Sequence, residues 1–256
     1  MNTIDKKYLQ LTREVTVAVG DADFTRKLKP SAIMGYCQDI AAEHAEIIGF
    51  GHKELLALNS TWVMIRMSFK ILRSPKIGEV LTITTLPEFP KTIDVNRGYY
   101  IYDATGELII SASSKWCVID VTTHKISRLA PVLGKFLELD YVPFEPFEGA
   151  NPKIPTFAEN ERVSPTPFTV QVTDLDQNLH MNNARYGDIV LNACGMEMLK
   201  DNSISRVDFN FVSQLFVGDK YEVYKMQKDN QIFIEARKPD SDVVIFRAIT
   251  EWQQNA

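Results

Sequence analysis

The hydrophobic and polar positions of this chain predict the same order of elements twice. Residues 12–19 alternate like a β-strand, with their valines on one face. Residues 30–48 then carry apolar side chains at helical spacing over much of the helix circumference, which is typical of a buried helix. Pro30 suits the first turn of this helix, and Gly49 suits its C-terminal cap.

Strand-like runs follow the first helix, after a short helical stretch at residues 53–58. They occupy residues 61–72, 80–86, 93–102 and 108–121. Turn-forming residues separate them, and Asp-Ala-Thr-Gly at residues 103–106 is a good hairpin signal. The pattern therefore predicts an antiparallel run of strands after a buried helix.

The second half of the chain repeats this plan. A strand-like run at residues 168–172 precedes an apolar helix at residues 182–199. Further strands are predicted at residues 205–212, 220–227, 232–238 and 243–252.

The two halves are joined by a proline-rich stretch. Residues 131–167 hold seven of the twelve prolines, so this stretch is neither a long helix nor a central strand. We therefore predict an N-terminal domain at residues 1–130, a linker at residues 131–163 and a C-terminal domain at residues 164–256.

Composition narrows the class of protein. The 256 residues are 45% hydrophobic and 24% charged, as in folded soluble proteins. A net charge of −5 argues against broad nucleic-acid binding. Cys37, Cys117 and Cys194 form no CxxC pair, so we expect reduced thiols and no zinc site or disulfide framework. Without a signal-peptide pattern or a membrane-length apolar run, we expect a cytoplasmic protein with no membrane partner.

The densest polar cluster lies at residues 174–183, between a strand end and a helix start. A turn followed by a capped helix accounts for its Asp and Asn residues. It does not account for His180, or for several such residues where one cap would suffice. On these residues alone, a capped turn and a functional site both stay open.

The chemistry of a helix start suits thioester hydrolysis. The first amides of a helix lack partners and the helix dipole adds positive charge, so the terminus stabilises an oxyanion. A nearby imidazole and amide orient the carbonyl or the water. The thiolate leaving group needs less acid catalysis than an amine, so no metal, cofactor or Ser-His-Asp triad is required.

Residues 174–186, DLDQNLHMNNARY, resemble the signature of plant and bacterial acyl-acyl-carrier-protein thioesterases. The likeness extends from about Tyr8 to Trp252. The matching segments of the first half, in order, are Thr61-Trp62-Val63, Arg66-Met67, Arg97-Gly98-Tyr99, Gly106-Glu107 and residues 112–116.

The resemblance implies an α+β fold of two tandem hot-dog domains, each a long helix wrapped by an antiparallel sheet. It also implies hydrolysis of fatty acyl-[acyl-carrier-protein] to free fatty acid and carrier protein in fatty acid biosynthesis. By position, Asp176, Asn178 and His180 fall on the family's catalytic residues. The family's fourth residue is a glutamate, and here its position holds Gln214. Glutamine holds a water but cannot accept its proton at neutral pH.

The two halves differ at the signature. Its counterpart at residues 21–28, DADFTRKL, keeps the acidic pair but has neither His nor Asn. We therefore expect one site, with the first half shaping the acyl pocket. Leu215 stands where some family members carry a cysteine, and Cys194 lies in the apolar helix, so no cysteine nucleophile is expected. His44 either lines the pocket or is a hydrogen-bonded core residue.

Rival functions stay open. The same fold serves acyl-CoA thioesterases, whose substrate shares the phosphopantetheine arm, and Gln214 also leaves room for a non-catalytic acyl-binding sensor. A homodimer is left open. An acidic carrier protein is expected to dock on basic residues, with ordinary surface charge as the alternative. The candidates are Arg66, Lys70, Arg73 and Lys76, or Arg26, Lys27 and Lys29.

Overall fold

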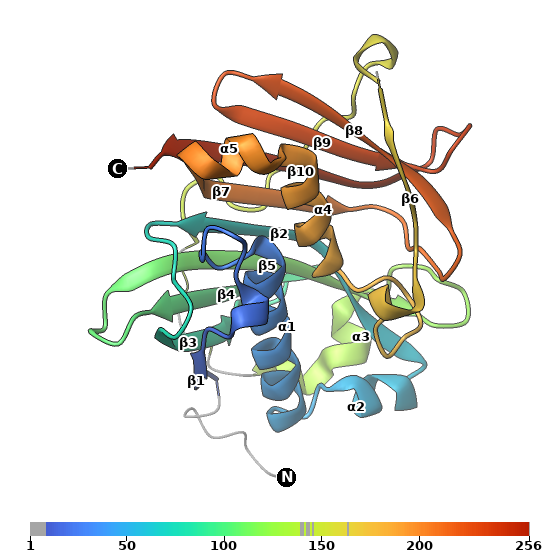
Figure 1. The fold of residues 1–256 in the computed structure, drawn as a ribbon. Coiled ribbons are helices and arrows are strands. Elements are labelled where there is room, and N and C mark those ends of the chain that lie inside the picture. Colours follow the sequence, from blue (N-terminus) through green and yellow to red (C-terminus); the bar gives the residue numbers. More distant parts are fainter. Residues whose placement is uncertain (1–8, 139–140, 142–143, 145, 163, 256) are drawn as a thin grey trace.

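A computed structural model describes residues 9–138, 141, 144, 146–162 and 164–255, except for the side chains of Lys135 and Phe136. Its described strands form one 10-stranded antiparallel sheet in the order β1-β3-β4-β5-β2-β7-β10-β9-β8-β6. The two halves of the sheet meet where β2 pairs with β7, and the strand order reads equivalently from either end (Figure 1). The halves are therefore related by an approximate twofold axis.

The N-terminal half confirms the predicted elements to within a few residues. Its strands and helices are β1 (Leu11–Thr16), α1 (Pro30–Ile47), α2 (His52–Ala57), β2 (Ser60–Ile71), β3 (Val80–Pro87), β4 (Asp94–Tyr102) and β5 (Leu108–Asp120). The first strand is shorter than predicted, because the chain turns into the 3-10 helix η2 (Val19–Asp21).

The C-terminal half repeats these elements. They are β6 (Thr166–Thr169), the 3-10 helix η5 (Val172–Asp174), α4 (Arg185–Cys194), α5 (Met196–Asp201), β7 (Asn202–Phe211), β8 (Lys220–Lys228), β9 (Gln231–Arg237) and β10 (Val244–Gln254). The prediction of one continuous helix at residues 182–199 is wrong. Gly195 has a φ of 84°, which ends α4 and starts a separate helix in a new direction.

Both long helices pack on the same face of the sheet (Figure 1). A Cβ atom added to Gly187 on α4 would lie 2.4 Å from the backbone nitrogen of Ser31, so glycine permits close contact between α4 and the start of α1. Met67 and Phe69 of β2 and Phe209 of β7 belong to one buried cluster that includes residues of both helices. This is the predicted α+β tandem hot-dog fold, with a shared core. No described helix is long and apolar enough to span a membrane.

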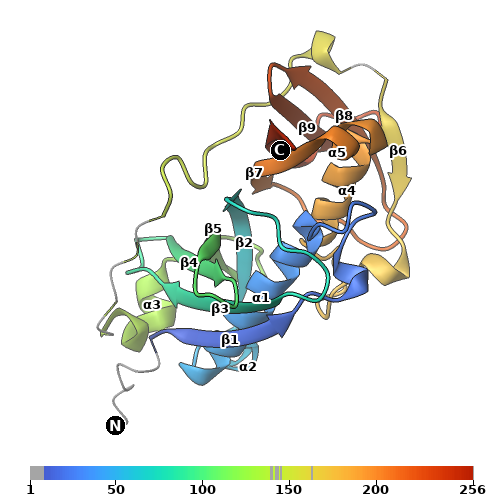
Figure 2. The same cartoon turned by 60° about the vertical axis from the view of Figure 1, so that its left-hand side comes forward.

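The segment between β5 and β6, which includes the predicted linker, forms α3 (Leu129–Leu133), the 3-10 helix η3 (Gly134–Glu138) and later the 3-10 helix η4 (Glu159–Glu161). Its residues 146–162 run along the side of the sheet away from α1 and α4 (Figure 2). Polar side chains of both halves hold it there. The backbone amides of Asn151, Ile154 and Phe157 donate to Ser68, Asn210 and Glu235 at 2.7, 2.9 and 3.2 Å. The linker thus binds across the joint between the halves.

Candidate functional site

The signature residues lie in a tight loop between η5 and α4. The amide of Asp176 donates to the carbonyl of His180 at 2.8 Å, which closes the loop. The Asp176 carboxylate accepts the amides of Asn178 at 2.8 Å and His180 at 3.4 Å. Leu179 takes the left-handed conformation, with φ of 62°. The contacts of Asp176 therefore fix the backbone that presents Asn178 and His180.

The loop before α1 has the same hydrogen bonds. The amide of Asp23 donates to the carbonyl of Lys27 at 2.9 Å. The Asp23 carboxylate accepts the amides of Thr25 at 2.7 Å and Lys27 at 3.3 Å. Arg26 takes the left-handed conformation, with φ of 69°. The loops therefore correspond residue by residue.

This correspondence shows how the two loops differ. Thr25 stands in the place of Asn178, and Lys27 stands in the place of His180. The C-terminal loop exposes Asn178 and half-buries His180, and no described residue forms a hydrogen bond with either side chain. Of the two loops, only the C-terminal one presents an amide and an imidazole side chain without a hydrogen bond to a described residue.

The segment after β7 packs against the C-terminal loop. The amide of Met181 donates to the carbonyl of Leu215 at 2.8 Å. The rings of His180 and Phe216 meet edge to face, with centroids 4.9 Å apart. Gln214 is exposed and directly precedes this contact segment. No hydrogen bond of the Gln214 side chain to another described residue is present.

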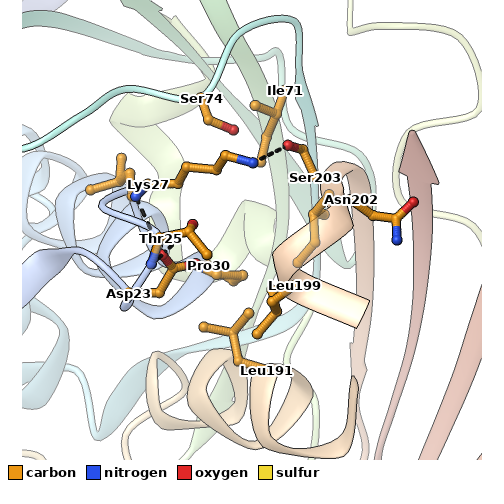
Figure 3. A pocket seen from close by; sticks show the side chains of 12 residues that line it. Asp23, Thr25, Lys27, Pro30, Ile71, Ser74, Leu191, Leu199, Asn202 and Ser203 are labelled. Atoms are coloured by element: carbon orange, nitrogen blue, oxygen red, sulfur yellow. Dashed lines mark hydrogen bonds between the residues drawn. The ribbon is translucent and has the colours of Figure 1, made fainter. Parts of the chain in front are cut away.

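The N-terminal half shows where Gln214 belongs. There the amide of Leu28 donates to the carbonyl of Pro75 at 2.9 Å, so Ser74 corresponds to Gln214. Ser74 lines a pocket together with the N-terminal loop (Figure 3). The full lining is Asp23, Thr25, Lys27, Leu28, Pro30, Ile71, Ser74, Leu191, Leu199, Asn202, Ser203 and Ile204. The equivalent arrangement in the C-terminal half places Gln214 beside its loop.

The pocket of the N-terminal half contains the lysine of its own loop. Lys27 reaches across the pocket, and its Nζ donates to Ser203 Oγ at 2.5 Å (Figure 3). The same Nζ donates to Asn255 Oδ1 at 2.6 Å. A cation held in this way has a structural role between the halves.

Nearly all backbone amides at the start of α4 have acceptors. Those of residues 181, 182 and 184–187 donate within the loop, the first turn or the segment after β7. Among the described residues, only the amide of Asn183 in this stretch has no acceptor. Its counterpart in the other half is Pro30, which has no N–H and lines the pocket of Figure 3. Sequence analysis missed Asn183, although comparing the two halves position by position would have found it.

The cysteines and His44 occupy the core. Burial raises the pKa of Cys194 to about 12 and that of Cys117 to about 11, and it also raises the pKa of Cys37. Thiolate nucleophiles are therefore disfavoured at neutral pH. His44 is fully buried, and its Nδ1 lies 2.9 Å from a guanidinium nitrogen of Arg97, which confirms the core interpretation.

Several of the predicted docking cations have internal partners. Arg66 donates to the carbonyl of Asn151 in the linker at 3.0 Å. Arg73 pairs with Glu79 at 2.9 Å and with Asp103 at 3.0 Å. These contacts, like those of Lys27, reduce the charge that either basic group offers to a partner.

Known proteins resemble this chain over both halves. The profile of the acyl-ACP thioesterase N-terminal domain matches residues 8–135, and that of the C-terminal domain matches residues 158–254. The chloroplastic acyl-[acyl-carrier-protein] hydrolase FATB2 of Cuphea viscosissima is 26% identical over 199 residues, which cover 74% of this chain and 48% of that protein. The chloroplastic oleoyl-acyl carrier protein thioesterase 2 of Arabidopsis thaliana is 28% identical over 194 residues, covering 70% and 52%. The chain spans about half the length of these curated relatives.

Solved structures share the fold. An acyl-ACP thioesterase from Bacteroides thetaiotaomicron has a TM-score of 0.87 at 24% identity, covering 98% of this chain and 100% of that one. The 12:0-ACP thioesterase from Umbellularia californica has a TM-score of 0.84 at 18% identity, covering 96% and 98%. Because both family profiles match, each over its own half, the chain belongs to the acyl-ACP thioesterase family.

Proposed function

We propose that this protein hydrolyses fatty acyl-[acyl-carrier-protein] to free fatty acid and carrier protein. Membership of the family supports this class of reaction. The observation that carries the proposal is the difference between two loops of equal backbone structure. The C-terminal loop offers Asn178, His180 and the free amide of Asn183, where the other loop has threonine, lysine and proline.

The proposed reaction uses the positive end of α4. The thioester carbonyl oxygen accepts a hydrogen bond from the backbone amide of Asn183. The oxyanion that forms is stabilised by that donor and by the helix dipole. Water attacks the carbonyl carbon while the His180 imidazole accepts one of its protons. Asn178 orients the carbonyl. The carbon–sulfur bond then breaks, and the thiolate leaves with the electron pair and takes the proton from His180.

Gln214 positions the attacking water in this proposal. Its amide donates to the water but accepts no proton from it, so the base is His180. The Asp219 carboxylate already has two partners. It accepts a hydrogen bond from the amide of Phe216 at 3.0 Å and lies 3.7 Å from Lys238 Nζ.

Two variants test this role of Gln214. We expect Gln214→Ala to slow turnover sharply, because it releases the water. Gln214→Glu should retain or raise turnover and add an ionisation to the pH profile, since a carboxylate acts as a base only when deprotonated. If Gln214→Ala equals the parent while Asp219→Ala is folded and inactive, the placement of Gln214 is wrong.

The primary test is release of thiol by the purified protein from acyl-carrier thioesters of graded chain length, without added metal. The matched variant is Asn183→Pro, which removes the amide donor at a position where the other half already has proline. We expect a loss in turnover of about a hundredfold to a thousandfold in a folded protein. No turnover at any chain length would favour an acyl-binding sensor, and faster turnover of acyl-CoA would favour a coenzyme A thioesterase.

A further inference from the structure

Gln38 on α1 is half-buried. Its Oε1 is buried, and no described residue donates a hydrogen bond to it. An acceptor left unsatisfied in the protein interior reduces stability. A donor from a bound substrate or a water molecule would explain why this acceptor is present.

The two helices establish the counterpart of Gln38. Both begin alike, because the amides of Ala32 and Arg185 donate to Lys29 and Asn182, which hold equivalent positions after the two loops. Four buried positions then match along both helices. They are Ile33, Met34, Cys37 and Ala41 on α1, and Tyr186, Gly187, Val190 and Cys194 on α4. In this register Gln38 corresponds to Leu191.

Leu191 shows which way Gln38 faces. Leu191 belongs to the C-terminal half, but it lines the pocket of the N-terminal loop beside Asp23 and Lys27 (Figure 3). Helix α4 therefore contributes to the pocket of the opposite half. By the twofold relation, Gln38 of α1 is expected beside the loop of Asn178 and His180. The pocket that Lys27 crosses has an apolar residue at this helix position, and the corresponding position of α1 has an amide.

We propose that Gln38, which comes from the N-terminal half, binds the attacking water in the C-terminal site. This inference rests on the proposed hydrolysis. The water donates one hydrogen bond to His180, which takes that proton during attack, and a second to Gln38 Oε1, and it accepts a hydrogen bond from Gln214. One lone pair then remains to attack the thioester carbonyl. Because no donor for Oε1 is found among the described residues, its partner in this arrangement is the water itself.

The experiment compares Gln38→Leu with Leu191→Gln in the full chain. Gln38→Leu copies the other half, so kcat for acyl-carrier thioester should fall about tenfold to a hundredfold while KM changes little. Its Tm should hold or rise, because an apolar group replaces an unsatisfied acceptor. Leu191→Gln should show the reverse, with a lower Tm and an unchanged kcat. Gln38→Glu keeps an acceptor at this position and should recover part of the lost turnover.

Each result decides the inference. An unchanged kcat in a folded Gln38→Leu protein would overturn it and leave the proposed function standing. A Tm that falls together with activity would assign Gln38 a structural role instead. A parent protein that hydrolyses no thioester would refute the proposed function, and this inference with it.

Discussion

Replacing Asp176 tests whether this residue only shapes the loop or also takes a proton in the reaction. Its carboxylate accepts two backbone amides, those of Asn178 at 2.8 Å and His180 at 3.4 Å. The shorter bond is well formed and the longer one is weak. Loss of both, in a loop that solvent reaches, should destabilise the active backbone by about 1–2 kcal/mol.

That free energy converts into a rate. A change of about 1–2 kcal/mol alters the ratio of two conformations by a factor of roughly 5–30. We therefore expect kcat of Asp176→Ala to fall by up to this factor, because Asn178 and His180 are presented in fewer molecules. Asp176→Asn keeps an oxygen that accepts the same amides, so it should stay within about threefold of the parent. Asp23→Ala removes the same pair of bonds from the N-terminal loop and should leave kcat unchanged.

Steady-state thiol release and thermal unfolding of the three variants provide the assay. A folded Asp176→Asn protein that is as inactive as Asp176→Ala would refute this reasoning, because the charge of the carboxylate would then be needed for chemistry. Equal losses of kcat at Asp23 and Asp176 would show that both loops carry catalytic groups.

Glu235 is fully buried and accepts hydrogen bonds from Arg237 at 2.6 Å and Arg247 at 3.1 Å. Glu235→Ala should therefore lower the free energy of unfolding, measured in urea, by about 3–5 kcal/mol. Glu235→Gln should lie between this variant and the parent. Burial raises the pKa of Asp208, so the folded state binds its proton more tightly and stability is lost as pH rises through that pKa. The free energy of unfolding of Asp208→Asn should therefore rise relative to that of the parent above pH about 4. A difference between the two proteins that stays constant between pH about 4 and 8 would contradict this. Burial also raises the pKa of Cys194 to about 12, so the native thiol should resist iodoacetamide at neutral pH, and the variant without cysteines should keep most activity if folded.

Local patterns predicted the elements because each strand and helix buries one face, and apolar residues recur along the sequence with the period of that face. The break at Gly195 was not predicted, because one glycine costs a helix only about 1 kcal/mol and does not require an interruption. Its φ of 84° depends on how α5 packs before β7, which neighbouring residues do not determine.

The sequence also predicted only part of the candidate site. The polar cluster stood out because a capped turn does not account for His180 or for so many Asp and Asn residues, and the family resemblance then assigned roles to Asn178 and His180. The free amide of Asn183 was missed, because every residue except proline has such an amide and only the hydrogen bonds of its neighbours single it out. Gln38 was missed because its place depends on the twofold relation between the halves, and no distance along the sequence encodes it.

The two loops differ at several positions that lie on separate elements of the fold. Two identical halves would carry the same loop twice, but here Lys27 connects the N-terminal loop to Ser203 and Asn255 of the other half. Replacing Lys27 by histidine would remove these contacts and still leave Pro30 without an amide donor. Leu191 would also remain in the N-terminal pocket, at the helix position that corresponds to Gln38. Because these differences lie on separate elements, we expect that no single substitution gives the N-terminal pocket the groups of the C-terminal loop.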